Sequence, residues 1–305
     1  AGGKDACLLF HNRTDGRELI LKLGRRRGLP ARVIPVETFH VASLGLDLLL
    51  GAVALGAGQV VVVAAGSEAP GYFDALRGQM GFGEEILRAF GYQGSHFELI
   101  VSGDLRALEQ RIWSLDAAKS PAEPAGFRLF DEKRTTLAFT IEYLATHAPA
   151  PQTVIPLSSG APFGEIEVNL ETCTMCMACV GACPEAALAD GGDQPQLRFI
   201  EANCVQCGLC EQACPEDAIA LVPRLLVGKE AKKERVKAGL AARASASEKE
   251  RETVVAVSME TKTPRPKTSA KPLMSEVPSQ KRMTAVIIDE IFESRIESHA
   301  RAKPS

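Results

Sequence analysis

Hydrophobic residues in the first 115 positions follow two alternating patterns. Short apolar runs rich in β-branched residues are typical of buried strands, and segments with apolar residues every three or four positions are typical of amphipathic helices. The predicted strands are CLLF, ARVIPVE, Val60–Val63 and HFELIVS, and the predicted helices are GRELILKLG, Leu46–Leu55, Phe73–Phe90 and DLRALEQRIWSL. Because strands and helices alternate, we predict an α/β domain over residues 1–115, with a small parallel sheet wrapped by helices.

One apolar stretch, Val41–Gly66, is long enough to cross a bilayer. Asp47 and Gln59 would be costly near the hydrocarbon centre, and the glycines at positions 56 and 58 indicate a turn between a helix and a strand. We therefore predict two buried elements of a soluble protein and no membrane span.

Residues 116–163 are predicted to connect two modules. The segment SLDAAKSPAEPAGF has the proline, alanine and serine content of a linker, and DEKRTTLAFTIEYLATHAP has helical spacing at Leu137, Ile141 and Leu144. We expect this helix and the segment after it to fix the second module to the α/β domain.

The second module carries eight of the nine cysteines, in two runs of one spacing. The runs are CTMCMACVGACP, from Cys173 to Pro184, and CVQCGLCEQACP, from Cys204 to Pro215. Each reads C-x-x-C-x-x-C-x-x-x-C-P. An iron-sulfur cubane requires four thiolates around four irons, three from a tight loop and one from elsewhere in the chain. The spacing therefore predicts iron-sulfur clusters.

Two other uses of these cysteines fit less well. Zinc sites close with four ligands and have no need of three cysteines at successive steps of three. Disulfides are not needed in a chain long enough to bury its own core. The ninth cysteine, Cys7, lies in the apolar segment ACLLF and is predicted to be a buried small hydrophobic residue.

The repeat extends beyond the cysteines. The offset from Cys173 to Cys204 also places Ile166 on Leu197 and Val168 on Phe199, and these alternating residues predict a strand entering each ligand loop. The segments PEAALA and PEDAIALV leave the loops and are predicted to form a helical turn, or a turn and a strand.

Residues 164–224 resemble the bacterial-type ferredoxin with two [4Fe-4S] clusters. The resemblance implies an α+β ferredoxin-like module in which the fourth cysteine of each run binds the cluster of the other run. Met177 departs from the pattern, because the second run has Gly208 there, and we expect a difference in potential between the clusters. The expected ligands are Cys173, Cys176, Cys179 and Cys214 for one cluster and Cys204, Cys207, Cys210 and Cys183 for the second.

Residues 1–115 resemble, by pattern, the small domain of the delta subunit of methyl-viologen-reducing hydrogenases. That iron-sulfur subunit passes electrons to heterodisulfide reductase, and its strands are followed by cysteines that bind an additional cluster. We predict that this cluster is absent and that the domain is a docking scaffold. In this chain the strands are followed by Thr38, Phe39 and His40, and by Gly66, Ser67 and Glu68.

The composition changes towards the end of the chain, and we predict a low-complexity, mostly disordered basic tail over residues 225–305. Residues 229–305 contain 17 Lys and Arg against 11 Asp and Glu, which leaves 18 against 27 in the rest of a chain of net charge −3. A basic tail can bind nucleic acid, but the interleaved charges and the lack of an aromatic platform favour a solvated extension. The segment MTAVIIDEIFESRIESH could dock to a partner as an amphipathic helix.

Two adjacent clusters without a catalytic motif predict one-electron transfer. We expect a low-potential ferredoxin-type carrier, or an electron-relay subunit of an oxidoreductase complex of the hydrogenase or formate dehydrogenase type, with redox proteins as partners. Oxygen-labile clusters and the absence of an export signal at the start favour the cytoplasm. The alternatives are a reductase with its own site in the α/β domain and a nucleic-acid-binding protein with structural clusters.

Overall fold

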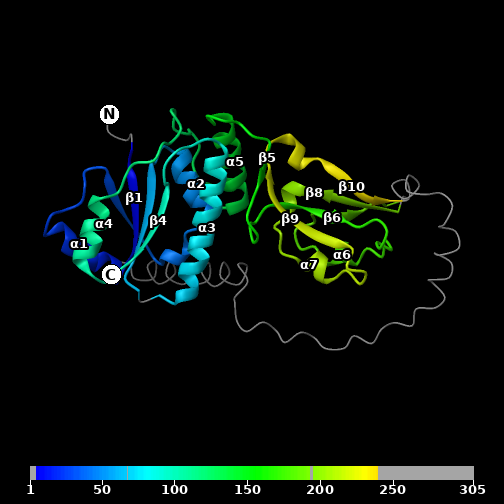
Figure 1. Ribbon diagram of the computed structural model, residues 1–305, viewed down its shortest axis with the longest axis horizontal. Coiled ribbons are helices and arrows are strands. Elements are labelled where there is room, and N and C mark those ends of the chain that lie inside the picture. The colour runs from blue at the N-terminus through cyan, green and yellow to red at the C-terminus, as the bar shows by residue number, and fades with distance from the viewer. Residues whose placement is uncertain (1–4, 67, 193–194, 240–305) are drawn as a thin grey trace, which may run out of the picture. The chain divides into compact units, whose positions relative to one another are not determined.

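The computed structural model describes residues 5–66, 68–192 and 195–239. The first part is an α/β domain with a parallel four-stranded sheet, as the sequence predicts (Figure 1). Its strands run in the order β2-β1-β3-β4. Their bounds are β1 (Cys7–Asn12), β2 (Val33–Thr38), β3 (Gln59–Ala64) and β4 (Phe97–Val101).

Helices cover both faces of this sheet. The residues of β3 are all buried, and alternate valines of this strand belong to two different hydrophobic cores. Val60 and Val62 pack with α2 and α3, whereas Val61 and Val63 pack with α1 and α4, which follows from the two-residue period of a strand. Figure 1 shows the two pairs of helices on opposite faces. The bounds are α1 (Asp15–Gly24), α2 (Leu46–Ala54), α3 (Pro70–Ala89) and α4 (Leu105–Trp113).

The apolar stretch from Val41 to Gly66 divides as predicted, into the short 3-10 helix η1 (Val41–Ser43), α2 and β3. Both α2 and β3 contribute fully buried residues to the core of the α/β domain. In the part of the chain that the structure describes, none of the helices has the length and apolar character needed to cross a bilayer.

The predicted linker packs closely on the α/β domain. The backbone of Ala125 donates a hydrogen bond to the carbonyl of Ala54 at 2.8 Å, and α5 (Lys133–Thr146) packs against α2. Leu144 of α5 belongs to the same hydrophobic core as Ile155 and Leu225 of the cysteine-bearing module. All the described residues fall within one compact unit, Ala1–Ala246. The bridging helix and the segment after it therefore join the two modules through a shared core.

The cysteine-bearing module consists of two antiparallel sheets, in the orders β5-β9-β6 and β10-β8-β7. The strand entering the first ligand loop, β6, pairs with the strand leaving the second, β9, so the two halves are interlocked. The bounds are β5 (Val154–Pro156), β6 (Gly164–Val168), α6 (Ala178–Ala182), β7 (Leu188–Asp190), β8 (Gln196–Ile200), η2 (Glu201–Asn203), α7 (Leu209–Gln212), β9 (Ile219–Leu226), η3 (Lys229–Lys232) and β10 (Glu234–Gly239).

The structure decides between the two alternatives predicted for the segments that leave the ligand loops. The segments PEAALA and PEDAIALV form a turn followed by a strand, β7 or β9, so the helical alternative is wrong. The helical turns α6 and α7 lie earlier, and each contains the third cysteine of its run. Each exit strand pairs with an entry strand, and the hydrogen bonds of that pairing outweigh the local helical preference of alanine.

The predicted start of the tail, at residue 225, is too early. Residues 225–239 complete β9 and form η3 and β10, and β10 pairs with β8. The sequence of η3 and β10 is rich in lysine and arginine, which is typical of a solvated extension. In the structure, however, Arg235 and Lys237 form ion pairs with carboxylates of the module, and Ala238 is buried. Residues 240–305, with the amphipathic segment near the end, lie outside the described residues.

Candidate iron-sulfur site

Each predicted set of four cysteines lines a cavity of its own. Both cavities combine three cysteines of one run with the fourth cysteine of the other run, as the resemblance to ferredoxins implies. The antiparallel pairing of β6 with β9 and the contact of α6 with α7 bring the two runs together. The first cavity is lined by Cys173, Cys176, Cys179 and Cys214, and the second by Cys204, Cys207, Cys210 and Cys183.

The two ligand loops have the same unusual backbone. Residues with left-handed φ angles occur at positions related by the offset from Cys173 to Cys204: Met175 (57°) with Gln206 (53°), and Met177 (59°) with Gly208 (75°). A loop that passes through the left-handed region curls so that its N–H groups face a common centre, which makes a concave site for an anion. The backbone of both loops is therefore suited to surround a negatively charged group.

Backbone N–H groups also meet two of the cysteine sulfurs. The amide of Ala187 donates to Sγ of Cys183 at 3.3 Å, and the amide of Ala218 donates to Sγ of Cys214 at 3.3 Å. These are the fourth cysteines of the two runs, each followed by a proline. Hydrogen bonds to a sulfur favour its negatively charged form.

The second and third cysteines of the two runs match in exposure, whereas the first cysteines do not, because Cys204 is buried and Cys173 is half-buried. Cys179 and Cys210, the third cysteines, are buried, while Cys176 and Cys207, the second cysteines, are exposed. Burial raises the pKa of the Cys210 thiol to about 11, and it also raises the pKa values of Cys179 and Cys204. Thiols with raised pKa values are protonated at neutral pH, so metal binding has to displace their protons.

The donor set fits a cubane. Four sulfur donors around each cavity are the ligands that [4Fe-4S] clusters take. Across residues 5–66, 68–192 and 195–239, no three His, Cys, Asp or Glu side chains lie close enough together to hold a single metal ion. A structural zinc would draw its four ligands to about 2.3 Å from one ion. A cubane carries one ligand on each of four irons and holds the sulfurs further apart.

Two polar side chains that the sequence pattern did not point to contact Cys204: Gln206, which lines the second cavity, and Arg134, which lies outside that lining. Gln206 donates from Nε2 to the carbonyl of Glu165 at 2.9 Å and to Sγ of Cys204 at 3.5 Å. Arg134, in the first turn of α5, donates from Nη2 to the carbonyls of Ala202 and of Cys204, the latter at 2.9 Å. No local pattern in the sequence connects position 134 with a cysteine 70 residues later.

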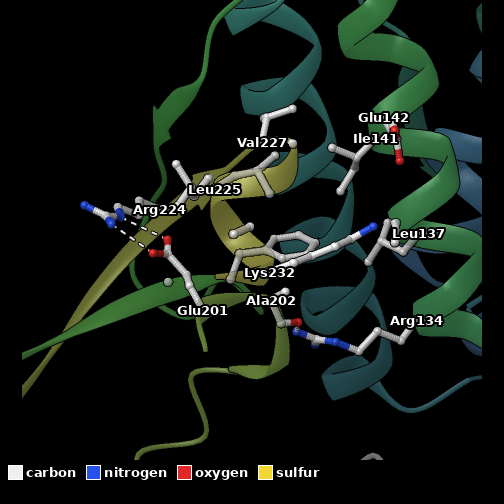
Figure 2. A pocket seen from close by; sticks show the side chains of 16 residues that line it. Arg134, Leu137, Ile141, Glu142, Glu201, Ala202, Arg224, Leu225, Val227 and Lys232 are labelled. Atoms are coloured by element: carbon white, nitrogen blue, oxygen red, sulfur yellow. Dashed lines mark hydrogen bonds and ion pairs between the residues drawn. The ribbon is translucent and has the colours of Figure 1, made fainter. Parts of the chain in front are cut away.

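Arg134 also lines a hollow between α5 and the cysteine-bearing module. The hollow has a volume of about 120 Å³, with apolar walls from Leu137, Ile141 and Leu225. Figure 2 shows Arg134 extending from α5 towards Ala202, and Glu201 facing Arg224 on the opposite side. The second cavity is thus the one that the bridging helix reaches.

A group of ion pairs holds the strands behind the second cavity. Glu201 pairs with Arg224 at 2.8 Å and with Arg235, and Glu165 pairs with Arg224 at 2.5 Å and with Lys237. Glu201 is 5% exposed. The network ties β6, β9 and β10 to the residues that precede Cys204.

The remaining candidates in the α/β domain have structural surroundings. Cys7 is fully buried at the start of β1, where burial raises the pKa of its thiol to about 11. His40 accepts a hydrogen bond from the amide of Ala42, and buried His96 contacts Glu84 and the carbonyl of Lys119. Both histidines are therefore hydrogen-bonded within the domain, as is usual for isolated histidines beside strands.

The comparisons with known proteins concern the cysteine-bearing module. Residues 172–218 match the 4Fe-4S dicluster domain. This segment contains all eight cysteines of the two runs, so the match supports [4Fe-4S] binding and a role in iron-sulfur electron transfer. A search of curated proteins gave no match to the chain.

Proposed function

We propose that this chain is an electron-transfer protein that carries two [4Fe-4S] clusters. The first cluster is bound by the cysteines of the first cavity and the second cluster by those of the second cavity. The fourth cysteine of each run is therefore a ligand of the other run's cluster. The observation that carries the proposal is the lining of the two cavities, each of which joins cysteines from both runs. When bound, the clusters accept and release one electron at a time.

The surroundings support a low-potential carrier or an electron-relay subunit. Residues 1–228 carry 18 Lys and Arg against 27 Asp and Glu, and this negative charge disfavours the addition of an electron, although salt screens its exposed part. Cys176 and Cys207 give each cavity one exposed edge, where a redox partner can approach. We propose a cytoplasmic oxidoreductase complex of the hydrogenase or formate dehydrogenase type as the setting.

In this proposal the α/β domain is a docking scaffold without catalytic residues. The shared core through Leu144, Ile155 and Leu225 holds the cysteine-bearing module against the scaffold. A rigid attachment keeps the clusters at a constant distance from a partner bound to the scaffold. Anaerobic purification of the native protein tests this arrangement: one stable redox partner supports a relay subunit, and a chain purified alone supports a free carrier.

Anaerobic reconstitution tests the cluster content. Two cubanes require about eight irons per chain, with an EPR signal after reduction. Cys183→Ala removes a ligand from the second cavity and Cys214→Ala from the first, so each substitution should damage the cluster of the opposite run. Cys7→Ala is the matched control, because Cys7 lies in β1, and this variant should keep the full iron content. A protein that binds zinc, or clearly fewer than about eight irons per chain, would refute the proposal.

A further inference from the structure

The two cavities have closely matched surroundings, which makes their differences informative. The offset from Cys173 to Cys204 relates the left-handed loop residues and the two amide hydrogen bonds to sulfur. It also relates Glu185, at the second cavity, to Glu216, at the first. A side chain that breaks this correspondence therefore acts on one cluster more than on the other.

Gln206 is the first such side chain. Its equivalent in the first loop is Met175, whose thioether has no N–H to donate. The Gln206 amide is oriented by the carbonyl of Glu165, which needs a donor, so Nε2 and not Oε1 faces Sγ of Cys204. Gly164 leaves the room for this side chain, because a Cβ atom there would lie 2.4 Å from Cδ of Gln206.

Arg134 is the second, and it comes from outside the repeat. Its guanidinium is held at the backbone of Cys204 by the carbonyls of Ala202 and Cys204, and burial lowers its pKa while the charges of Glu185 and Cys204 act in the opposite direction. An arginine stays protonated in proteins, so a fixed positive charge lies beside the second cavity. Neither cavity is lined by a lysine or an arginine, so Arg134 acts on the second cavity from behind Cys204, through the carbonyl that it binds.

Both side chains favour negative charge at the second cavity. Reduction adds one negative charge to a cluster, and a nearby cation or an N–H donor to a ligating sulfur stabilises the reduced form. The burial of Cys204 acts in the opposite direction, because a less polar environment disfavours added charge. Arg134 is half-buried, which reduces the screening by solvent and strengthens its interaction with a charge at Cys204.

We propose that Arg134 and Gln206 hold the second cluster at a higher reduction potential than the first, and so set the direction of electron transfer. This inference rests on the proposed two-cluster function. With this order of potentials, an electron from a redox protein would enter at the exposed edge near Cys176 and would pass from the cluster held by the first cavity to the one held by the second. It would leave to a second redox protein near exposed Cys207. Arg134 and Gln206 are positioning residues for this charge and bind no iron.

An EPR-monitored redox titration of the reconstituted full chain tests Arg134. Arg134→Gln should lower the potential of one cluster and leave the other unchanged, with about a tenfold smaller ratio of reduced to oxidised form at a fixed poise, equivalent to about 59 mV for one electron. Arg134→Lys, which keeps the charge, should restore most of the difference. Lys133→Gln is the matched control, because this neighbouring side chain is exposed. Equal shifts of both clusters, or none, would overturn the role of Arg134.

A pair of exchanges at equivalent positions tests Gln206 and assigns the clusters. Gln206→Met removes the N–H donor from the second cavity, and Met175→Gln introduces one at the first. The two variants should shift different clusters in opposite directions, and the double variant should reduce the gap between the two potentials. If two clusters assemble but the wild-type potentials coincide, the inference fails while the proposed function stands. If two clusters do not assemble, the proposed function itself fails.

Discussion

The carboxylate of Glu201 accepts two hydrogen bonds from the guanidinium of Arg224, at 3.0 Å from Nε and 2.8 Å from Nη2. Such a bidentate pair has a defined geometry, which a lysine could not supply. Glu201 lies three residues before Cys204, and Arg224 lies in β9, the exit strand of the second run. This contact therefore fixes the start of the second ligand loop to the sheet.

Loss of the Glu201 charge should lower the stability of the protein around the second ligand loop. Glu201→Gln leaves Arg224 and Arg235 with Glu165 as their remaining partner, so we expect a loss of about 2 kcal/mol, below the 3–5 kcal/mol typical when a buried charge loses its only partner. The measurement is urea unfolding of the reconstituted protein, followed by visible absorption of the clusters. Glu234→Gln, in an exposed pair with Arg198, is the control and should change stability by less than about 1 kcal/mol. Equal losses in both variants would contradict this prediction.

The lowered pKa of Glu201 also predicts that the protein loses stability in acid. Burial alone would raise the pKa of Glu201, but hydrogen bonds from Arg224 and Arg235 outweigh burial and lower it. A carboxylate whose folded pKa lies below its unfolded value of about 4.3 contributes stability above that pH, and this contribution is lost as the pH falls through the folded pKa. The free energy of unfolding should fall below about pH 4 more steeply in the wild type than in Glu201→Gln. Parallel pH profiles of the two proteins would count against the assignment.

Glu84 should stabilise the α/β domain in a similar way. Its carboxylate accepts hydrogen bonds from the amides of His96, at 2.5 Å, and Phe97, at 2.8 Å, at the start of β4. Glu84→Ala leaves two backbone donors without this acceptor and should cost about 1–3 kcal/mol. Fluorescence of Trp113, the single tryptophan, reports unfolding of this domain.

The control for Glu84 is Asp74→Ala in the same helix, because Asp74 pairs with Arg77 at an exposed position. This variant should unfold close to the wild type. Burial alone would raise the pKa of Glu84, but hydrogen bonds with His96 and Phe97 lower it, so the difference between Glu84→Ala and wild type should shrink as the pH falls below about 4. A difference that does not change with pH would show that the lost packing, and not the charge, matters.

Gly164 should tolerate no side chain. A Cβ atom at this position would lie 2.5 Å from the carbonyl oxygen of Val222 and 2.4 Å from Cδ of Gln206, so both β9 and Gln206 would have to move. We expect Gly164→Ala to cost about 1–3 kcal/mol in urea unfolding. Gly78→Ala is the opposite case: no atom lies within 4 Å in mid-helix α3, and the change should stabilise the protein by up to about 1 kcal/mol. Stabilisation by both substitutions would contradict the predicted clash.

Local patterns account for most of the elements. The four strands of the parallel sheet and the helices between them follow the predicted order, since a buried strand and an amphipathic helix each leave a short-range period in the sequence. The spacing of the cysteines, together with the resemblance to two-cluster ferredoxins, predicted which four line each cavity. The assignment of these residues as cluster ligands stays a prediction.

Long-range contacts decided the rest. The charged sequence of β10 favours a solvated tail, and only its pairing with β8 and the ion pairs of Arg235 and Lys237 make it a strand. Likewise, the packing of α5 on α2 brings Arg134 to Cys204. The sequence by itself determined most of the elements and the triplet of cysteines in each loop, because both depend on neighbours a few residues apart, whereas the pairing of β6 with β9 brings in the fourth cysteine of each set from the other run. The tertiary structure decided which charges face the second cavity, because electrostatic interaction depends on distance in space and not along the chain.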